Sequence, residues 1–452
     1  MVERVDVVVV GLGVGGEEVA GRLAEAGLAV VGVEGRLVGG ECPYWGCVPS
    51  KMMIRAGNLL AEARRIPGMA GDVAVTPDWA PVAARIREEA TDYWDDKVAV
   101  ERFVGKGGRF VRGWARLTGP GRVVVGEQEY AASRAIVLAT GTEPVIPPIE
   151  GLADTPKWTN REAIEAERLP ESMIVLGGGA IGLELAQAYA RFGTTVTVVE
   201  ALDRLLAMEE PESSELAEDA LRGDGIAVHT GAKATRVGYP DGRFAVTLDG
   251  GTKLSAERLL VATGRRVNLA SVGLDTVGLD PRARALSTDE RMRAGERMWA
   301  VGDVTGHGAF THVAMYQAGI AIRDILGQDG PPADYRALPR VTFTDPEIGA
   351  VGLTEAQARE GGIGVQVGVT RLPASARGWI HKAGNEGFIK LVADAERGVL
   401  IGATSAGPAG GEVLAGLAVA VHGEVPVERL RHMIYAYPTF HRAIEDALGK
   451  LR

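Results

Sequence analysis

The stretch Gly11-Leu12-Gly13-Val14-Gly15-Gly16 lies between the β-branched run Val5 to Val10 and the helical stretch Glu17 to Ala26. This order predicts a strand, a tight turn and a helix. Glycines at the first, third and sixth positions let the backbone turn and approach a pyrophosphate, whose charge the helix N-terminus would face. The next predicted strand, Ala29 to Val33, ends at Glu34, whose carboxylate can hold an adenosine ribose. The region is therefore predicted to bind a dinucleotide.

The same arrangement recurs in the middle of the chain. The apolar run Met173 to Leu176 precedes the turn Gly177-Gly178-Gly179-Ala180-Ile181-Gly182, which the helical stretch Leu183 to Phe192 follows. A further predicted strand, Thr195 to Val199, leads into Glu200. Because the acidic residue follows the first glycine at the same spacing in both copies, we interpret the copies as a duplicated unit. Two fingerprints predict two dinucleotides, such as FAD and a nicotinamide nucleotide.

Cys42 and Cys47 are the only two cysteines of the 452 residues, and both lie in the segment Gly39 to Lys51, shortly after the first fingerprint. A pair at this spacing can close a small strained disulfide, and thiols that begin a helix gain thiolate character. Such a disulfide is exchangeable rather than structural. Two inert core cysteines are the alternative interpretation. A metal site is not predicted, because no second Cys or His pair stands at ligand spacing.

These features resemble the flavoprotein disulfide reductases, the pyridine nucleotide-disulfide oxidoreductase family of lipoamide dehydrogenase, glutathione reductase and mercuric reductase. Four further motifs carry the resemblance along the whole chain: Ala139-Thr140-Gly141, Ala262-Thr263-Gly264-Arg265, Ala300-Val301-Gly302-Asp303-Val304 and Phe343-Thr344-Asp345-Pro346-Glu347. The resemblance implies an α/β fold with two Rossmann-like domains, one for FAD and one for NAD, and a C-terminal α+β dimerisation domain. It also implies a homodimer.

The chain is too long for a single core, so about three domains are expected. We expect a first part of the FAD-binding domain at residues 1–149, an NAD-binding domain at 150–265, a second part of the FAD-binding domain at 266–337, and a dimerisation domain at 338–452. The net charge of -10 argues against nucleic acid as a partner. The sequence shows neither a long apolar span nor a signal-peptide pattern, so a cytoplasmic protein without a membrane partner is expected.

The resemblance assigns a role to each reactive residue. Electrons are expected to pass from NADH through the flavin to the disulfide, with Cys42 as the interchange thiol and Cys47 against the isoalloxazine. Lys51, one helical turn past Cys47, is expected at the flavin N5 edge, where its charge favours reduced flavin, with Glu184 as its partner. A surface lysine and an ordinary helix acid are the alternatives. The predicted cofactor-binding residues are Gly11, Gly13, Gly16, Glu34, Lys51, Ala115, Thr140, Gly141, Asp303, Thr311, Gly177, Gly179, Gly182, Glu200 and Gly264.

The choice of nicotinamide nucleotide depends on Glu200. A carboxylate there accepts hydrogen bonds from the ribose hydroxyls of NAD but repels the 2′-phosphate of NADP. NADH is therefore the expected donor. Arg204 is near enough in sequence to leave use of NADPH open, whereas Ala201, at the nearer position, offers no charge.

The C-terminal segment departs from the family pattern. In lipoamide dehydrogenase and glutathione reductase this segment carries a His-Pro pair with a glutamate five residues after the histidine, and that histidine deprotonates the incoming thiol across the dimer interface. Here Tyr437 stands at the histidine position, near Cys42 of the other subunit by resemblance, and Arg442 stands at the glutamate position. A phenol with a pKa of about 10 is a poor base at neutral pH. His441 is the nearest imidazole. Two interpretations are open for it: a substitute base or a surface histidine.

Three functions are compatible with the sequence. The first is an NADH-dependent, FAD-containing reductase of a small disulfide. In the second, electrons leave the flavin or the dithiol for a quinone, a metal ion, oxygen or a second nucleotide. A tyrosine at the position of Tyr437 resembles the pattern of mercuric reductase and soluble transhydrogenase. Trp45, before Gly46, resembles the redox loop of the transhydrogenase. However, two cysteines cannot supply the extra C-terminal pair of mercuric reductase, and transhydrogenase dispenses with the second redox cysteine. The third is a redox-inactive flavoprotein scaffold.

Overall fold

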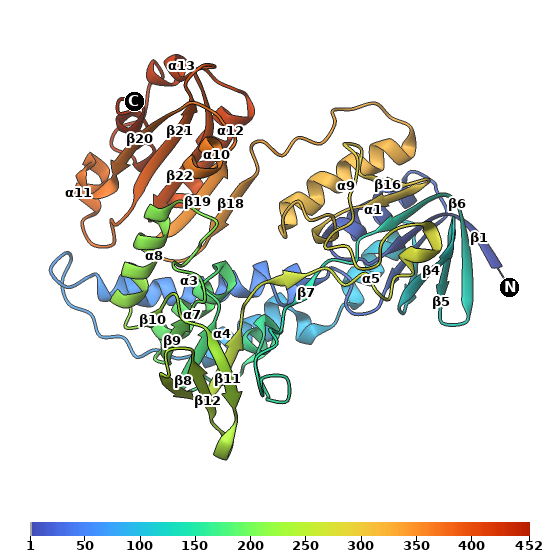
Figure 1. Ribbon diagram of the computed structural model, residues 1–452, viewed down its shortest axis with the longest axis horizontal. Coiled ribbons are helices and arrows are strands. Elements are labelled where there is room, and N and C mark those ends of the chain that lie inside the picture. Colours follow the sequence, from blue (N-terminus) through green and yellow to red (C-terminus); the bar gives the residue numbers. More distant parts are fainter. Residues whose placement is uncertain (1) are drawn as a thin grey trace. The chain divides into compact units, whose positions relative to one another are not determined.

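The computed structural model describes residues 2–452, which divide into two compact units (Figure 1). The first unit comprises the chain up to Pro49 together with Ala84–Val145 and Gly264–Asp334, and the second comprises Ser50–Ala83, Ile146–Thr263 and Tyr335–Arg452. The domain boundaries expected at residues 149, 265 and 337 remain a prediction, because compactness alone assigns no function to a stretch of chain.

The first unit is built on an eight-stranded sheet whose main path is β16-β17-β6-β1-β2-β3. The strands from β17 to β3 run parallel, and β4 and β5 join β6 as antiparallel strands. The strands are β1 Val2–Val10, β2 Val30–Glu34, β3 Arg109–Arg112, β4 Ala115–Gly119, β5 Arg122–Val125, β6 Gln128–Leu138, β16 Arg293–Gly295 and β17 Met298–Ala300. The run Val7 to Val10 is buried, as expected for a parallel strand covered on both faces.

Helices cover this sheet. They are α1 Val14–Glu25, α2 Glu41–Tyr44, α5 Lys97–Gly105 and α9 Thr311–Leu326. Helices α1 and α9 pack against each other, and Leu23 and Ile322 share one apolar cluster with Val9 of the sheet. A two-stranded ribbon of β7 Glu143–Pro144 and β15 Arg265–Arg266 forms where the chain leaves and re-enters the unit.

The second unit contains a smaller parallel sheet in the order β10-β9-β8-β14 and an antiparallel sheet of β11, β12 and β13. Its strands are β8 Ser172–Leu176, β9 Thr195–Val199, β10 Ala227–His229, β11 Ala234–Gly238, β12 Phe244–Leu248, β13 Lys253–Ala256 and β14 Arg258–Val261. The accompanying helices are α6 Asn160–Glu165, α7 Ala180–Phe192 and α8 Pro211–Gly223. The unit also holds most of the long helix α3 Cys47–Arg64 and of α4 Ala80–Arg85.

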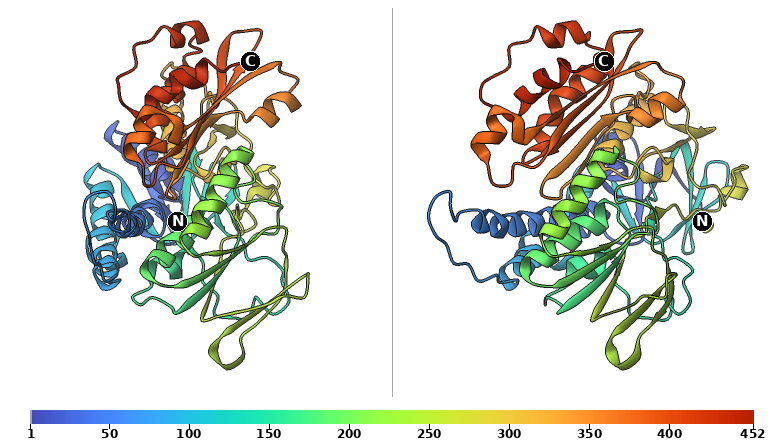
Figure 2. Two further views of the ribbon diagram at one scale, coloured as in Figure 1. Left: turned by 90° about the vertical axis from the view of Figure 1, so that its left-hand side faces the viewer. Right: turned by 60° about the vertical axis from the view of Figure 1, so that its left-hand side comes forward.

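The C-terminal part of the second unit is an antiparallel sheet in the order β18-β19-β22-β21-β20, with helices along it (Figure 2). Its strands are β18 Pro339–Thr342, β19 Glu347–Gly352, β20 Val365–Arg371, β21 Phe388–Asp394 and β22 Val399–Gly407. Its helices are α10 Glu355–Glu360, α11 Ala376–His381, α12 Gly410–His422, α13 Val427–Arg431 and α14 Ala443–Leu448. Leu417 of α12 and Leu448 of α14 share an apolar core with Leu391 of the sheet. This α+β arrangement is the one predicted.

Both nucleotide-type helices begin three residues earlier than expected. Helix α1 begins at Val14 instead of Glu17, and α7 begins at Ala180 instead of Leu183. The cause is the same in both cases, because the middle glycine of each turn is the N-cap and the rest of the turn is already helical. Among residues 2–452, no helix combines the length and the apolar character needed to cross a bilayer.

Candidate active site

The turn after β1 shows why its glycines are required. Gly11 has a φ of 91°, and a Cβ atom at this position would overlap the carbonyl group of Ala139. A Cβ on Gly16 would overlap the carbonyl oxygen of Gly11. Gly13 differs, since its nearest neighbour would be the Cα of Gly40 at 4.0 Å. Backbone packing therefore requires the outer two glycines, and the middle glycine leaves space for a ligand.

The turn after β8 repeats this construction. Gly177 has a φ of 114°, and a Cβ there would overlap the carbonyl group of Ala262. A Cβ on Gly182 would overlap the carbonyl oxygen of Gly177. At the middle glycine, Gly179, a Cβ would meet no atom within 4 Å. The two turns therefore present the same backbone and the same open position.

The two acidic residues also occupy equivalent places. Glu34 Oε2 accepts a hydrogen bond from the backbone N–H of Leu12 at 2.8 Å, and Glu200 Oε2 accepts one from that of Gly178 at 2.5 Å. Neither α1 nor α7 has a side-chain hydrogen bond at its N-cap. Each helix N-terminus thus has N–H groups available to an anion beside a carboxylate suited to a ribose. This arrangement fits the diphosphate and adenosine of FAD in the first unit and of a nicotinamide nucleotide in the second.

Asp303 lies in a hydrogen-bonded chain inside the first unit. The hydroxyl group of Thr142 donates to Asp303 Oδ2 at 2.7 Å, and Arg265 Nε donates to Thr142 Oγ1 at 2.8 Å. Burial raises the pKa of the Asp303 carboxyl group above its usual value. Arg265 also donates to the backbone carbonyl of Thr142, so it fixes the loop that carries Thr140 and Gly141.

The two cysteines lie on adjacent short elements and are not joined by a disulfide in this structure. Cys42 lies in α2, and Cys47 begins α3. The Cys47 Sγ atom lies 3.4 Å from the hydroxyl oxygen of Thr311, the first residue of α9. The hydrogen bond with Cys47 and burial together raise the pKa of the Cys42 thiol. The Cys42 thiol therefore keeps its proton more strongly than an ordinary cysteine.

Lys51 and Glu184 form an ion pair inside the second unit. The Lys51 Nζ atom lies 2.6 Å from Glu184 Oε2, and the Glu184 side chain is only 7% exposed. The other oxygen of Glu184 accepts the backbone N–H of Phe343 at 2.8 Å, and the Phe343 ring centroid lies 4.6 Å from the same Nζ. Phe343 begins one of the family motifs but was not among the predicted catalytic or cofactor-binding residues. Nothing in the motif itself indicates which lysine its aromatic ring meets.

Tyr437 extends from the C-terminal part of the second unit and is 69% exposed. The guanidinium group of Arg442 lies 5.5 Å from the centre of its ring. His441 is half-buried, with its Nε2 atom 3.3 Å from the hydroxyl oxygen of Thr439. The phenol therefore has a cation beside it and is available for contact with another molecule.

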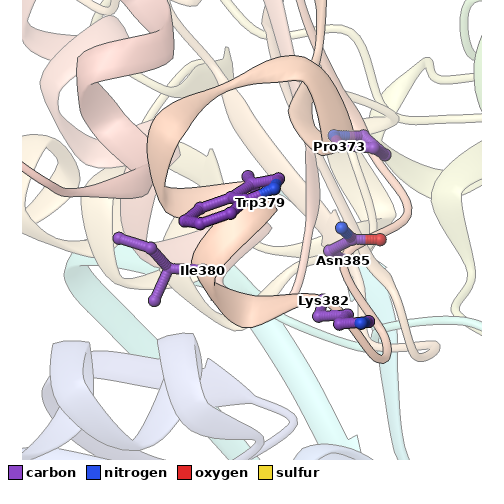
Figure 3. Close-up of a pocket in the computed structure, with 5 residues that line it drawn as sticks. All are labelled: Pro373, Trp379, Ile380, Lys382 and Asn385. Carbon is purple, nitrogen blue, oxygen red and sulfur yellow. The ribbon is translucent and has the colours of Figure 1, made fainter.

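A hollow of about 440 Å³ lies beside α11 in the same part of the chain (Figure 3). It is lined by Pro373, Trp379, Ile380, Lys382 and Asn385. Trp379 is 77% exposed. The hollow contains no residue that the sequence analysis selected.

The structure distributes the predicted residues over both units. The first unit holds Gly11, Gly13, Gly16, Glu34, Cys42, Cys47, Ala115, Thr140, Gly141, Gly264, Asp303 and Thr311. The second holds Lys51, Gly177, Gly179, Gly182, Glu184, Glu200 and Tyr437. The individual roles of these residues remain predictions. Within residues 2–452 no cluster of three or more His, Cys, Asp or Glu side chains is arranged to hold a metal ion.

Two family models match the chain. Residues 5–318 match the pyridine nucleotide-disulphide oxidoreductase family, and residues 338–448 match the dimerisation domain of the same family. The second match confirms the predicted character of the C-terminal domain.

Full-length relatives give the same result. A mercuric reductase of Acidithiobacillus ferrooxidans is 34% identical, over 98% of this chain and 82% of that protein. A dihydrolipoyl dehydrogenase of Chlorobaculum tepidum is 35% identical, over 98% of this chain and 96% of that protein.

Solved structures extend the comparison. The Cu(II) complex of RclA, an HOCl-induced flavoprotein disulfide reductase of Escherichia coli, superimposes with a TM-score of 0.87 at 25% identity and covers 99% of both chains. LpdA of Mycobacterium tuberculosis has a TM-score of 0.85 at 26% identity, over 99% of both chains. The predicted family and fold class are therefore confirmed. The chain belongs to the class I pyridine nucleotide-disulphide oxidoreductases, a family of flavoprotein oxidoreductases that carry a redox-active cysteine pair, here Cys42 and Cys47.

Proposed function

We propose that the protein is an NADH-dependent, FAD-containing reductase of a small disulfide that works as a two-fold homodimer. The observation that carries the proposal is the cysteine pair. Cys42 lies in α2 and Cys47 begins α3, so both thiols lie in one short segment, and Cys47 Sγ lies 3.4 Å from Thr311 Oγ1. Two cysteines this near in the chain suit reversible exchange with a disulfide substrate.

The proposed reaction is balanced by two electrons. NADH is oxidised to NAD⁺, the S–S bond of the substrate breaks, and two thiols form with one proton taken from solvent. Bound FAD would supply the two-electron relay between nicotinamide and sulfur. The residues of this chain orient the reactants and control the protons: Glu34 and Glu200 hold the adenosine riboses, and Lys51 places a positive charge near the flavin.

Cys42 is the proposed attacking sulfur and needs to lose its proton before it attacks. Burial and the hydrogen bond with Cys47 raise its pKa, so a base would accelerate the step. Tyr437 of a partner subunit is proposed to lie near this sulfur, but a phenol is a poor general base at neutral pH. We therefore propose an acceptor that needs little base catalysis.

The proposed preference for NADH is supported by the surroundings of Glu200 and Arg204. Glu200 lies at the turn with both oxygens accepting backbone N–H groups, those of Gly178 and Leu202. Arg204 is engaged elsewhere, because its guanidinium donates to Ser214 Oγ at 2.6 Å and to the carbonyl of Ala207 at 2.6 Å. A 2′-phosphate at the ribose would thus meet a carboxylate, while the nearest arginine in sequence is already bound.

NADH is expected to exceed NADPH in kcat/KM by at least about tenfold, which corresponds to about 1.4 kcal/mol of transition-state stabilisation. The measurement is steady-state reduction of one artificial acceptor with each nucleotide. Glu200→Ala should narrow the ratio by removing the repulsion of the 2′-phosphate, whereas the matched surface change Glu218→Ala should leave it unchanged. A wild-type enzyme that uses NADPH equally well would contradict the assignment.

The proposed homodimer is supported by the dimerisation domain at residues 338–448 and by its surface. Large apolar side chains are exposed there: Ile434 is 96% exposed, and Val419 on α12 is 69% exposed. Side chains of this kind on a dimerisation domain are suited to burial against a second copy. Sedimentation at several concentrations tests the proposal, and a monomer at micromolar concentration would exclude it.

Tyr437→Phe is expected to change disulfide turnover only modestly, because the lost phenol is a poor base. The double variant with Tyr437→His and Arg442→Glu should raise turnover by supplying an imidazole and a carboxylate in place of a phenol and a guanidinium. Both variants are measured by reduction of a glutathione-like disulfide with NADH and, in the reverse direction, by oxidation of dihydrolipoamide with NAD⁺. A loss of more than about a hundredfold, or about 2.7 kcal/mol, in Tyr437→Phe together with no gain in the double variant would show that the tyrosine is catalytic.

The replacement of the usual histidine by Tyr437 also favours a second candidate, in which electrons pass to a metal ion or a quinone. Mercuric reductase appears among the relatives, although this chain has no third cysteine to receive a metal. Anaerobic titration with NADH followed by a panel of disulfides, quinones and metal ions distinguishes the candidates. Turnover that survives Cys42→Ser points to direct transfer from the flavin.

A further inference from the structure

We propose that Phe343 is a positioning residue for Lys51, so that the turn between β18 and β19 of the dimerisation domain determines where the Lys51 ammonium group points. The inference rests on the proposed function, in which Lys51 lies beside the flavin. It adds the aromatic ring of Phe343 to the two polar partners of Lys51, which are Glu184 Oε2 at 2.6 Å and Ser50 Oγ at 3.3 Å.

Three groups form a closed set of contacts. Lys51 Nζ lies 2.6 Å from Glu184 Oε2 and 4.6 Å from the centroid of the Phe343 ring. The backbone N–H of Phe343 donates to Glu184 Oε1 at 2.8 Å. One oxygen of Glu184 therefore binds the Lys51 ammonium. The other oxygen binds the backbone of Phe343, whose ring faces the same ammonium. An aromatic face within about 6 Å attracts such a cation.

The turn that carries Phe343 is fixed by α7. The backbone N–H of Asp345 donates to Gln187 Oε1 at 2.7 Å, and Gln187 Nε2 donates to the carbonyl of Asp345 at 2.9 Å. Arg191 Nη2 donates to Asp345 Oδ2 at 2.8 Å. Glu184, Gln187 and Arg191 recur at helical spacing, so one face of α7 holds both ends of the turn. The ring is thus placed by the helix that also supplies the carboxylate partner of Lys51.

Helix α3 is joined to the same turn at two points. Lys51 contacts Phe343, and Arg65, at the residue after the end of α3, donates from Nη2 to Asp345 Oδ2 at 2.8 Å. The turn therefore connects α3 with α7. Lys51 and Arg65 thus provide direct contacts between α3 and the turn.

The chemistry of the lysine side chain explains why the Phe343 ring would matter as a further partner. Its ammonium is a compact charge on a flexible four-carbon stem, and the Lys51 side chain is still 35% exposed. The Glu184 carboxylate and the Ser50 hydroxyl hold the ammonium at two points, and the aromatic face of Phe343 closes a further side. A charge that favours reduced flavin acts fully only when it is held in place before the reaction.

The first test measures the position of Lys51 without using the flavin. Phe343→Leu removes the aromatic face, Phe343→Met does the same with a different shape, and Phe343→Tyr retains it. Acylation of Lys51 by an amine reagent is followed by peptide mass spectrometry in FAD-free and FAD-bound protein. Lys51 is expected to be labelled at least threefold faster in the Leu and Met variants than in the wild type. In the Tyr variant the labelling rate should equal that of the wild type. Lys97, whose side chain is 73% exposed, is the internal control.

The second test measures the flavin midpoint potential. Phe343→Leu should disfavour reduced flavin at least threefold, a negative shift of about 14 mV for a two-electron couple. Phe343→Tyr should retain the wild-type potential. In a Lys51→Met background the Leu substitution should add no shift, because the two residues act as one unit.

Two results would overturn the proposal: wild-type labelling of Lys51 in both the Leu and Met variants, or a potential shift that persists without Lys51. Failure of the proposed function gives a different result. If no disulfide is turned over, the substrate assignment is wrong. The difference in Lys51 labelling still tests the role of Phe343, because that measurement needs neither substrate nor FAD.

Discussion

Replacement of Cys42 by serine is expected to lower disulfide reduction at least about a thousandfold, or about 4 kcal/mol, while FAD binding and NADH oxidation by an artificial acceptor persist. A serine hydroxyl is far less acidic than a thiol and cannot form the mixed disulfide that exchange requires. The measurement is turnover of each acceptor by wild type and variant at saturating NADH.

Cys47→Ser is the matched control for this prediction, because it removes the other sulfur of the same pair. It should also stop disulfide reduction, but it should additionally remove the long-wavelength absorbance expected on NADH addition, since Cys47 is the sulfur assigned to the flavin side. Disulfide turnover that is unchanged in both variants would refute a dithiol route and would favour direct transfer from the flavin.

Arg191→Met is expected to lower the free energy of unfolding by about 3 kcal/mol, the largest stability effect that we predict. The Arg191 side chain is 2% exposed and lies between Asp224 and Asp345, with its Nη1 atom also donating to Asn58 Oδ1 at 2.6 Å. Methionine fills similar volume but removes the buried cation from two half-buried carboxylates, of which Asp345 retains Arg65 and Asp224 loses this partner. The measurement is the midpoint and slope of urea unfolding, followed for the full chain.

The control for Arg191 is Arg222, whose side chain is 55% exposed and pairs with Glu218 at 2.6 Å on the same helix. Arg222→Met should cost less than about 1 kcal/mol, since exposed ion pairs contribute little. Arg191→Lys should lie between the two, because it keeps the charge but not the planar fork of donors. Equal shifts for Arg191→Met and Arg222→Met would mean that the buried network contributes no more than a surface pair.

Arg191 belongs to a buried polar face of α7. One face of this helix supplies Glu184 to Lys51, Gln187 to the backbone of Asp345, and Arg191 to two carboxylates. The polar residues are buried and yet hydrogen-bonded, which is what a helix interior to a polar network requires. The helix that begins at the second nucleotide turn thus also organises the surroundings of Lys51.

The two nucleotide turns could be predicted from sequence because their requirements are local. Gly11 and Gly177 adopt positive φ values, and the outer glycines admit no Cβ against a neighbouring carbonyl. The strand, the turn, the helix and the acidic residue follow one another along a short stretch of chain. The whole pattern can therefore be recognised in the sequence. The cysteine pair was equally visible, because both members lie in one segment. The starts of α1 and α7 differ from the expected ones because Gly13 and Gly179 cap these helices and the residues after them are already helical.

The family and the fold class could therefore be predicted from the residues alone, together with the two glycine turns and the segment that holds both cysteines. The tertiary structure alone decided that Phe343 faces Lys51 and that Asp345 receives Arg65 and Arg191. It also decided that Arg204 is bound by its own loop. The physical reason is separation: Phe343 and Glu184 are 159 residues apart, and such a contact depends on the packing of whole elements, which no local pattern of residues encodes.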